Sequence, residues 1–140
     1  MFEFHGWATI RCTTENPDVE GEVALQDAAV EAVRESIRTS QLDQWGNVLF
    51  DLSVRNGGAQ LTVAGLKNHG AIRDDVLGLY RYIAQVAPGS YGIVYIYDDE
   101  DAANSNAFRV HVLARGTVTE HSDPFLSPFV PVVEDRYPFE

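Results

Sequence analysis

The densest group of chemically capable side chains is a run of four acids, Asp98 to Asp101. Carboxylate oxygens are the ligands that Ca²⁺ and Mg²⁺ prefer. A calcium loop begun at Asp99 would, however, place Asn104 where the turn needs a glycine and Val110 where a bidentate glutamate belongs. We therefore predict no metal site here, and we expect the run to form a loop that faces solvent or a partner.

The histidines and the cysteine are the other candidates for catalysis or metal binding. His5, His69, His111 and His121 show no pair at a spacing of three or four residues, and neither H-E-x-x-H nor C-x-x-C occurs. The lone Cys12 falls on the apolar side of its predicted strand, where a thiol packs and does not react. No nucleophile elbow, phosphate-binding loop or dinucleotide fingerprint is present. The sequence predicts no cofactor and no enzyme.

Charge excludes several classes of partner. The chain has 140 residues, with 21 Asp and Glu against 10 Lys and Arg, for a net charge of −11. Such a surface repels nucleic acid and anionic lipid and attracts a basic partner. The apolar runs are too short to span a bilayer, no leader-like start is seen, and a single cysteine is typical of a reducing compartment. We expect a cytoplasmic protein.

Hydrophobic periodicity predicts the elements in the first half of the chain. Apolar residues alternate from Phe2 to Cys12, which is typical of a half-buried strand. After a turn at Asn16 and Pro17, residues 21–40 carry apolar side chains at helical spacing. The runs 47–54 and 59–67 flank Asn56-Gly57, a pair that favours a tight hairpin. These two runs should therefore pair antiparallel.

The second half is predicted to add one helix and two strands. Residues 73–87 have helical periodicity and stop at Pro88-Gly89, and residues 91–98 and 107–115 are apolar strand segments. The order β-α-β-β-α-β-β predicts an α+β fold, with an antiparallel or mixed sheet and two helices on one face. We expect a single domain over residues 1–140, with residues 121–140 as a proline-rich coil packed on the body.

Aromatic side chains concentrate on two of the predicted strands. Trp7 alternates with polar residues, which favours an exposed anchor of the kind that interfaces enrich. Tyr91, Tyr95 and Tyr97 share one face of their strand, but apolar residues also lie opposite them, so either face could be the buried one. If both helices cover one side of the sheet, the other side is where a partner should bind.

Several short motifs occur here in a fixed order: MFEFHGWATI at the start, PGSYGIVYIYDDED followed by FRV, then VLARG, DPFLSP and VEDRYP. In this respect the chain resembles an immunity-protein family of bacterial polymorphic toxin systems. The resemblance runs from Met1 to about Tyr137 and is weakest between Thr13 and Ser40. Its motif positions fall on Trp7, Tyr91, Gly92, Tyr95, Asp98 to Asp101, Asn106, Phe108, Arg109, Arg115, Gly116, Asp123, Pro124, Phe125 and Pro128.

The resemblance implies a small intracellular α+β protein, encoded beside a toxin, that binds the toxin domain and protects the producing cell without catalysis. Physical reasoning adds that an acidic inhibitor would suit a basic, nuclease-like active site and would associate quickly with it. We predict a toxin contact at Asp98, Asp99, Glu100, Asp101, Trp7, Tyr95, Tyr97, Arg109 and Asp123.

Two other functions stay open at this point. Split β-α-β domains often bind small molecules, so a regulatory ligand-binding module is one alternative. A small hydrolase that uses His5 or His111 with Asp51 is the other. An exposed sheet edge would also allow a homodimer.

Overall fold

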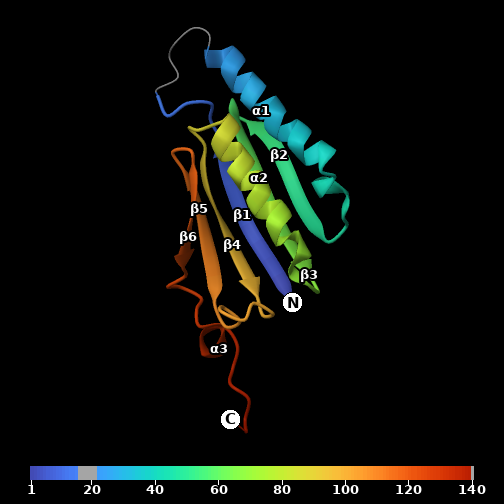
Figure 1. Cartoon of the computed structure of the whole chain (residues 1–140), viewed down its shortest axis with the longest axis vertical. Coiled ribbons are helices and arrows are strands. Elements are labelled where there is room, and N and C mark those ends of the chain that lie inside the picture. The colour runs from blue at the N-terminus through green and yellow to red at the C-terminus, as the bar shows by residue number, and fades with distance from the viewer. Residues whose placement is uncertain (16–21, 140) are drawn as a thin grey trace.

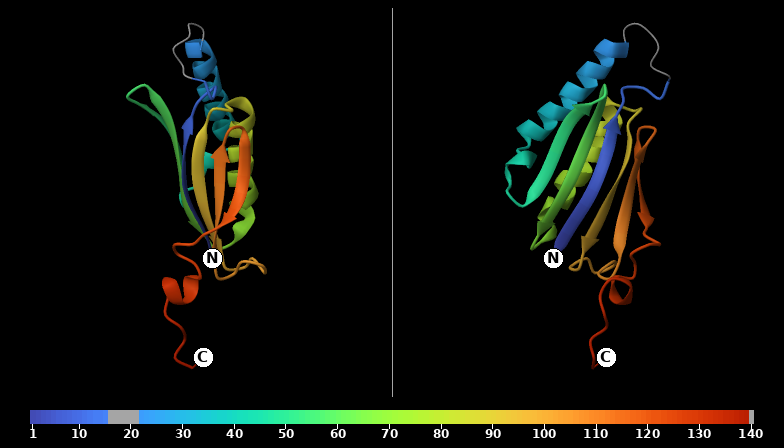
Figure 2. Two further views of the ribbon diagram at one scale, coloured as in Figure 1. Left: turned by 90° about the vertical axis from the view of Figure 1, so that its left-hand side faces the viewer. Right: turned by 180° about the vertical axis from the view of Figure 1, so that it is seen from behind.

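The computed structural model describes residues 1–15 and 22–139, arranged as one layer of sheet against one layer of helices (Figures 1 and 2). Two long helices, α1 (Glu22–Thr39) and α2 (Arg73–Val86), lie on the same side of the sheet (Figure 2). The shorter elements are η1 (Leu42–Gln44), η2 (Gly70–Ile72) and α3 (Phe129–Val132). No helix in these described residues is long and apolar enough to cross a bilayer.

The sheet has six strands in the order β2-β3-β1-β4-β5-β6, and every neighbouring pair is antiparallel. Their bounds are β1 (Phe2–Ile10), β2 (Val48–Arg55), β3 (Gly58–Lys67), β4 (Tyr91–Asp98), β5 (Phe108–Ala114) and β6 (Thr117–Ser122). The α+β class and an antiparallel sheet are confirmed. The turn predicted at Asn16 and Pro17 lies outside the described residues.

The element order differs from the prediction by one strand, β6, in a stretch where none was expected. Arg115 and Gly116 have φ angles of 50° and 76°, so the chain reverses in two residues and pairs β6 with β5. A tight hairpin of this type requires positive φ at both central positions, but arginine is not among the residues that favour this conformation. The strand was missed for that reason.

The core lies between the two long helices and the side of the sheet that they cover. Alternate residues of β1 are almost fully buried, namely Phe2, Phe4, Ala8 and Ile10. The buried stripes of α1 and α2 pack onto the sheet through Val30, Val33, Ile37, Val76, Tyr80 and Ile83. Burial of each large apolar side chain contributes about 1.5–3 kcal/mol, so this strand pattern and these helical stripes fix which side faces the helices.

A close approach of α2 to the middle of the sheet depends on Gly6. The single O–H of Tyr80 is shared between two acceptors, the carbonyl oxygens of Trp7, at 3.1 Å, and Ile93, at 3.2 Å. A Cβ atom on Gly6 would lie 2.5 Å from the Ile93 oxygen and 2.8 Å from the Tyr80 hydroxyl. Burial raises the pKa of Tyr80 well above its ordinary value, so the phenol stays a donor.

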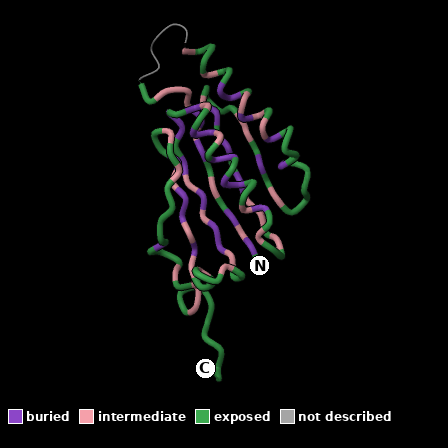
Figure 3. The backbone as a smooth tube through the Cα atoms, in the orientation of Figure 1, coloured by how far each residue is buried: buried purple, intermediate pink, exposed green. Residues whose placement is uncertain are grey.

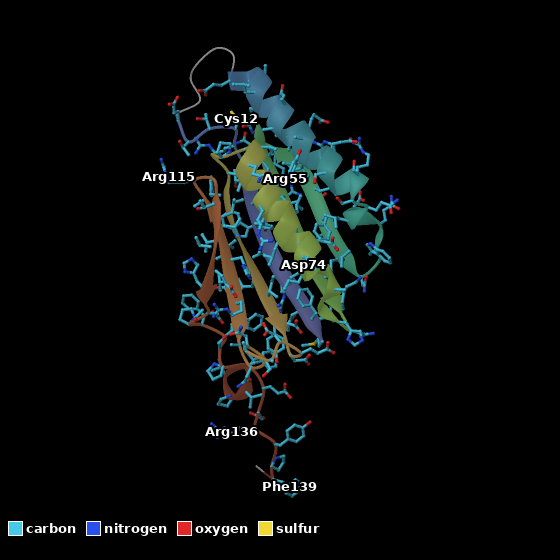
Figure 4. All side chains as sticks on the ribbon, in the orientation of Figure 1. Cys12, Arg55, Asp74, Arg115, Arg136 and Phe139 are labelled. Carbon is cyan, nitrogen blue, oxygen red and sulfur yellow. The ribbon has the colours of Figure 1, made fainter. Side chains whose placement is uncertain are left out.

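In the part of the chain that the structure describes, the hydrogen bonds that join the C-terminal segment to the body come from its first half. The Asn106 side chain accepts a hydrogen bond from the Val130 N–H at 2.8 Å and donates one to the Val130 oxygen at 3.1 Å. Beyond α3 the chain runs away from the sheet (Figures 1 and 4), and Phe139 is 98% exposed. The expected coil over residues 121–140 thus begins as the end of β6, continues into α3 and ends in an exposed tail.

Candidate functional site

The side of the sheet opposite α1 and α2 is covered by neither of them (Figure 2), and we call it the open face. In the β1–β4 register His5 lies opposite Tyr95 and Thr9 opposite Tyr91, so the tyrosines of β4 share the face of Trp7. The structure thereby decides between the two orientations that the sequence left open. The aromatic side chains of both strands meet on the side without the long helices.

Trp7 and Tyr91 form the exposed aromatic pair of the open face. Their ring centroids are 6.1 Å apart at an interplanar angle of 86°, an edge-to-face arrangement. Trp7 is 47% exposed and Tyr91 is 44% exposed, whereas Tyr95 is half-buried against Phe108. Figure 3 shows the exposed and intermediate stretches of the backbone. Each ring holds the other in place while half of its surface remains available to a partner.

Exposed leucines extend the open face toward β2 and β3. Leu49 lies opposite Ala64, and Ala64 lies opposite His5, while Leu66 lies opposite Glu3. These two leucines are exposed and border a shallow hollow that Glu3 and His5 also line. Sequence reasoning missed Leu49, Leu66 and Tyr91 as contact candidates. The period-two alternation of their strands would have placed them on the face of Trp7 once the register was known.

Tyr97, a predicted contact residue, is covered by the C-terminal segment. Its ring stacks on Phe129 with centroids 4.4 Å apart and touches Phe108 at 5.2 Å. The Tyr97 hydroxyl donates a hydrogen bond to the Ser105 oxygen at 3.2 Å, and the side chain is only 5% exposed. Tyr97 thus lies on the same side as Trp7 but is not part of the surface that a partner could touch directly.

The first and last acids of the run Asp98 to Asp101 form ion pairs with Arg73, at the start of α2. Asp98 approaches the Arg73 guanidinium at 2.8 Å and Asp101 approaches it at 3.5 Å. The pKa of Asp101 is lowered, chiefly because its carboxylate accepts a hydrogen bond from the Ala103 N–H. These two carboxylates therefore hold the loop to the helix, a structural task that the sequence run did not reveal.

The two middle acids are paired but remain accessible. Asp99 lies 2.6 Å from the amino group of Met1, and Glu100 lies 2.9 Å from His69 Nδ1. Both carboxylate side chains are about half exposed. Because exposed pairs of this kind contribute little to stability, these acids can exchange their present partners for those of another protein.

Arg109 lies on the other side of the sheet from Trp7. Its guanidinium contacts Glu120 at 2.9 Å and donates a hydrogen bond to the Ser122 hydroxyl at 3.0 Å. The Arg109 contact holds the pKa of Glu120 below its ordinary value. The structure therefore does not bring Arg109 into one surface with the exposed aromatic pair.

Asp123 is a buried turn-forming residue. Burial raises the pKa of its carboxyl, but hydrogen bonds from the N–H groups of Phe125 and Leu126 and from the Ser127 hydroxyl outweigh burial and lower it. All three donors lie 2.9 Å away. Asp123 shapes the start of the C-terminal segment and is not exposed to a partner.

The histidines are spread over separate places. His5 contacts Glu3 at 3.2 Å, His69 pairs with Glu100, and His121 contacts the Thr119 hydroxyl at 2.8 Å. Across residues 1–15 and 22–139 no three His, Cys, Asp or Glu side chains are grouped so that they could hold a metal ion. His111 faces the helix side of β5 whereas Asp51 faces the open side of β2, so the hydrolase pair His111–Asp51 is not formed.

Comparison with known proteins gives one family match. Among solved structures, a phage SAM lyase in its apo state aligns with this chain at 11% identity over 88% of this chain and 90% of that chain, with a TM-score of 0.28, too low to indicate a shared fold. No curated protein matches. The model of the family described as Immunity protein 7 matches residues 1–135, nearly the whole chain. The protein therefore belongs to the Immunity protein 7 family.

Proposed function

We propose that this protein binds the domain of a cognate bacterial toxin and blocks its activity, without catalysis, in the cytoplasm of the cell that makes the toxin. Membership of an immunity-protein family supports this function and does not favour the regulatory module or the hydrolase. The structural observation that carries the proposal is the Trp7–Tyr91 pair, exposed on a rigid sheet that no long helix covers on that side.

The open face has the composition of a protein contact surface. Interface energy is dominated by a few large aromatic residues near the centre of the contact, and Trp and Tyr are enriched among them. Trp7 and Tyr91 sit on neighbouring central strands, with Leu49 and Leu66 exposed toward one edge. Because the backbone of a hydrogen-bonded sheet is already ordered, association costs little backbone conformational entropy beyond the translational and rotational entropy that every complex loses.

Negative charge borders one end of the open face. Tyr97 lies at that end, and its pKa is raised first by burial and then by the nearby charges of Asp99, Glu134 and Glu3. An aromatic surface with an acidic margin fits a basic toxin domain, and the net charge of −11 would speed its approach. We therefore retain Asp99 and Glu100 as contact residues, together with Trp7 and Tyr95.

Truncation of the exposed aromatic pair tests the placement of the interface. The probe is the toxin encoded beside this gene, purified as an inactive variant, and the readout is its dissociation rate from the immobilised immunity protein. We expect Trp7→Ala and Tyr91→Ala each to weaken binding by about tenfold or more. Trp45→Ala is the matched control because Trp45 is also exposed but lies before β2, under Lys67 Nζ at 4.9 Å from its ring.

The outcomes separate the function from the site. If the wild-type protein protects cells and all three variants bind the toxin as tightly as it does, the interface does not lie on the open face, while the proposed function stands. Failure of the wild-type protein to form a complex, with cells left unprotected, would refute the function itself. Light scattering of the free protein reports in addition whether it forms a dimer, which the edge strands β2 and β6 would allow.

Neutralising the accessible acids tests the electrostatic part. Asp99→Asn with Glu100→Gln should slow association several-fold at low salt and leave dissociation nearly unchanged. The control is Asp27→Asn with Asp43→Asn, which removes the same charge from exposed positions on α1 and η1. Equal slowing by both double variants would show that only net charge matters and would remove Asp99 and Glu100 from the contact.

A further inference from the structure

A cleft with an unusual concentration of cations lies on the helix side of the sheet. It has a volume of about 190 Å³ and is bounded by α2 and by strands β4 to β6. Its floor is apolar, formed by Leu77, Ile96 and Val118. The polar side chains that line it are Arg73, Arg81, Asp101, Arg109, His111 and Glu120. Three of the ten basic residues of an acidic protein therefore converge on one small space.

His111 lines this cleft without a hydrogen-bond partner from the described part of its own chain. The residue is only 8% exposed, and its ring nitrogens have no hydrogen-bond partner within the described residues. These nitrogens are not among the buried atoms that are sealed from solvent without a partner, so they are open to the cleft that His111 lines. A ligand oxygen there would accept a hydrogen bond from the imidazole without displacing any partner from the chain.

The cations of the cleft are only partly neutralised. Arg73 is held by Asp98 and Asp101, and Arg109 is held by Glu120 at 2.9 Å. Arg81 is exposed and has no ion-pair partner in the part of the chain that the structure describes. A guanidinium with free donors is the protein group best suited to carboxylate and phosphate oxygens. Three guanidiniums therefore face three carboxylates, and Arg81 is the arginine of the lining whose donors are free for an anion.

We propose that this cleft binds one small oxyanion, a carboxylate or phosphate group, through Arg81 and His111. The volume lies below the roughly 300 Å³ at which pockets for drug-sized ligands begin, so the site fits a group of the size of phosphate or malonate. The overall negative charge does not prevent this, because salt screens charges that are more than about 8 Å away at physiological ionic strength.

Titration with inorganic phosphate and, separately, with malonate tests the site and tells the two chemistries apart. The readout is the set of His111 ring signals in a ¹H–¹³C NMR spectrum of the full chain. We expect them to shift with a Kd on the order of 1 mM for the preferred anion. Arg81→Gln should raise that Kd about tenfold, because it removes the unpaired guanidinium. Arg55→Gln is the control with the same loss of charge, in the β2–β3 hairpin.

Binding should also tighten as pH falls toward 6. Burial lowers the pKa of His111, with opposing influences from Glu120 on one side and Arg73, Arg109 and Arg81 on the other. A bound anion favours the imidazolium, so protonation and binding reinforce each other. No shift of the His111 signals with either anion up to about 20 mM, well above the expected Kd, would overturn the proposal. An equal rise in Kd for Arg55→Gln would do so as well.

Discussion

The ring of Phe129 stacks on that of Tyr97 with centroids 4.4 Å apart and planes inclined by 20°. This contact closes the end of the open face and joins the C-terminal segment to β4. Because Phe129 covers a phenol that would otherwise be exposed, its loss should be visible at Tyr97 itself. The acidity of one tyrosine thus reports whether the C-terminal segment is docked.

We expect Phe129→Ala to destabilise the fold by about 1–2 kcal/mol, less than truncation of a fully buried phenylalanine because Phe129 is only half-buried. Burial raises the pKa of Tyr97, so uncovering the ring should lower that pKa toward its ordinary value of 10.0. Ultraviolet titration of the tyrosines measures the change. Phe139→Ala is the control, since Phe139 is 98% exposed. An unchanged titration in Phe129→Ala would contradict the covering of Tyr97 by Phe129.

The Gly6–Tyr80 contact predicts a second stability effect. A methyl group on Gly6 would collide with the Ile93 backbone oxygen, so Gly6→Ala should cost about 2–3 kcal/mol in urea unfolding. Tyr80→Phe should cost about 1–2 kcal/mol, because two carbonyl groups lose a donor.

Gly78→Ala is the matched control for that series. No atom lies within 4 Å of the Cβ position at Gly78, which is exposed in α2, so alanine there should stabilise the helix by about 0.5–1 kcal/mol. If Gly6→Ala proved as harmless as Gly78→Ala, the close approach of α2 to β1 would be wrong.

The two hairpins show why one strand pair was predicted from the sequence and the other was not. Asn56-Gly57 and Arg115-Gly116 both turn the chain in two residues with positive φ at each position. The first pair has the residues that such a turn favours, and the hairpin was predicted. The second has arginine in the same conformation, and β6 was missed. Local chemistry identifies an element only where the residue types are those that the geometry prefers.

The exposure of the predicted site residues could not be read from the sequence for a different reason, because it depends on contacts between distant segments. The alternation of polar and apolar residues in β1 was enough to predict that Trp7 is exposed. No local pattern, however, reveals that Phe129 covers Tyr97 or that Arg73 pairs with Asp98. Exposure of Leu49 and Leu66 likewise follows from the pairing of β2, β3 and β1. A run of acids indicates charge, but not which of its members the fold itself uses.

Asp123 should make stability depend on pH in the acid range. Its pKa is lowered in the folded protein from the ordinary value of 3.8. A lowered folded-state pKa gives stabilisation that is present above pH 3.8 and is lost as pH falls through the folded pKa. We expect Asp123→Ala to cost about 1–3 kcal/mol at pH 7, because three donors lose their acceptor.

The comparison that tests this is urea unfolding of wild type and variant at pH 7, 5, 4 and 3, which bracket the ordinary carboxyl pKa. The difference between the two proteins should be constant down to about pH 4 and shrink below it. Asp135→Ala, in the exposed tail, is the control and should show little difference at any of these values. A difference for Asp123→Ala that did not change with pH would contradict the role of its charge.

The two hairpins also allow a matched exchange of residues. Asn populates the left-handed region more readily than arginine, for which that conformation costs on the order of 1 kcal/mol. Arg115→Asn should therefore stabilise the protein by about 0.5–1 kcal/mol, and Asn56→Arg should destabilise it by a similar amount. Thermal and urea unfolding of both variants measure the two effects. Both residues are exposed, so packing contributes little, and changes of the same sign would show that φ does not decide the outcome.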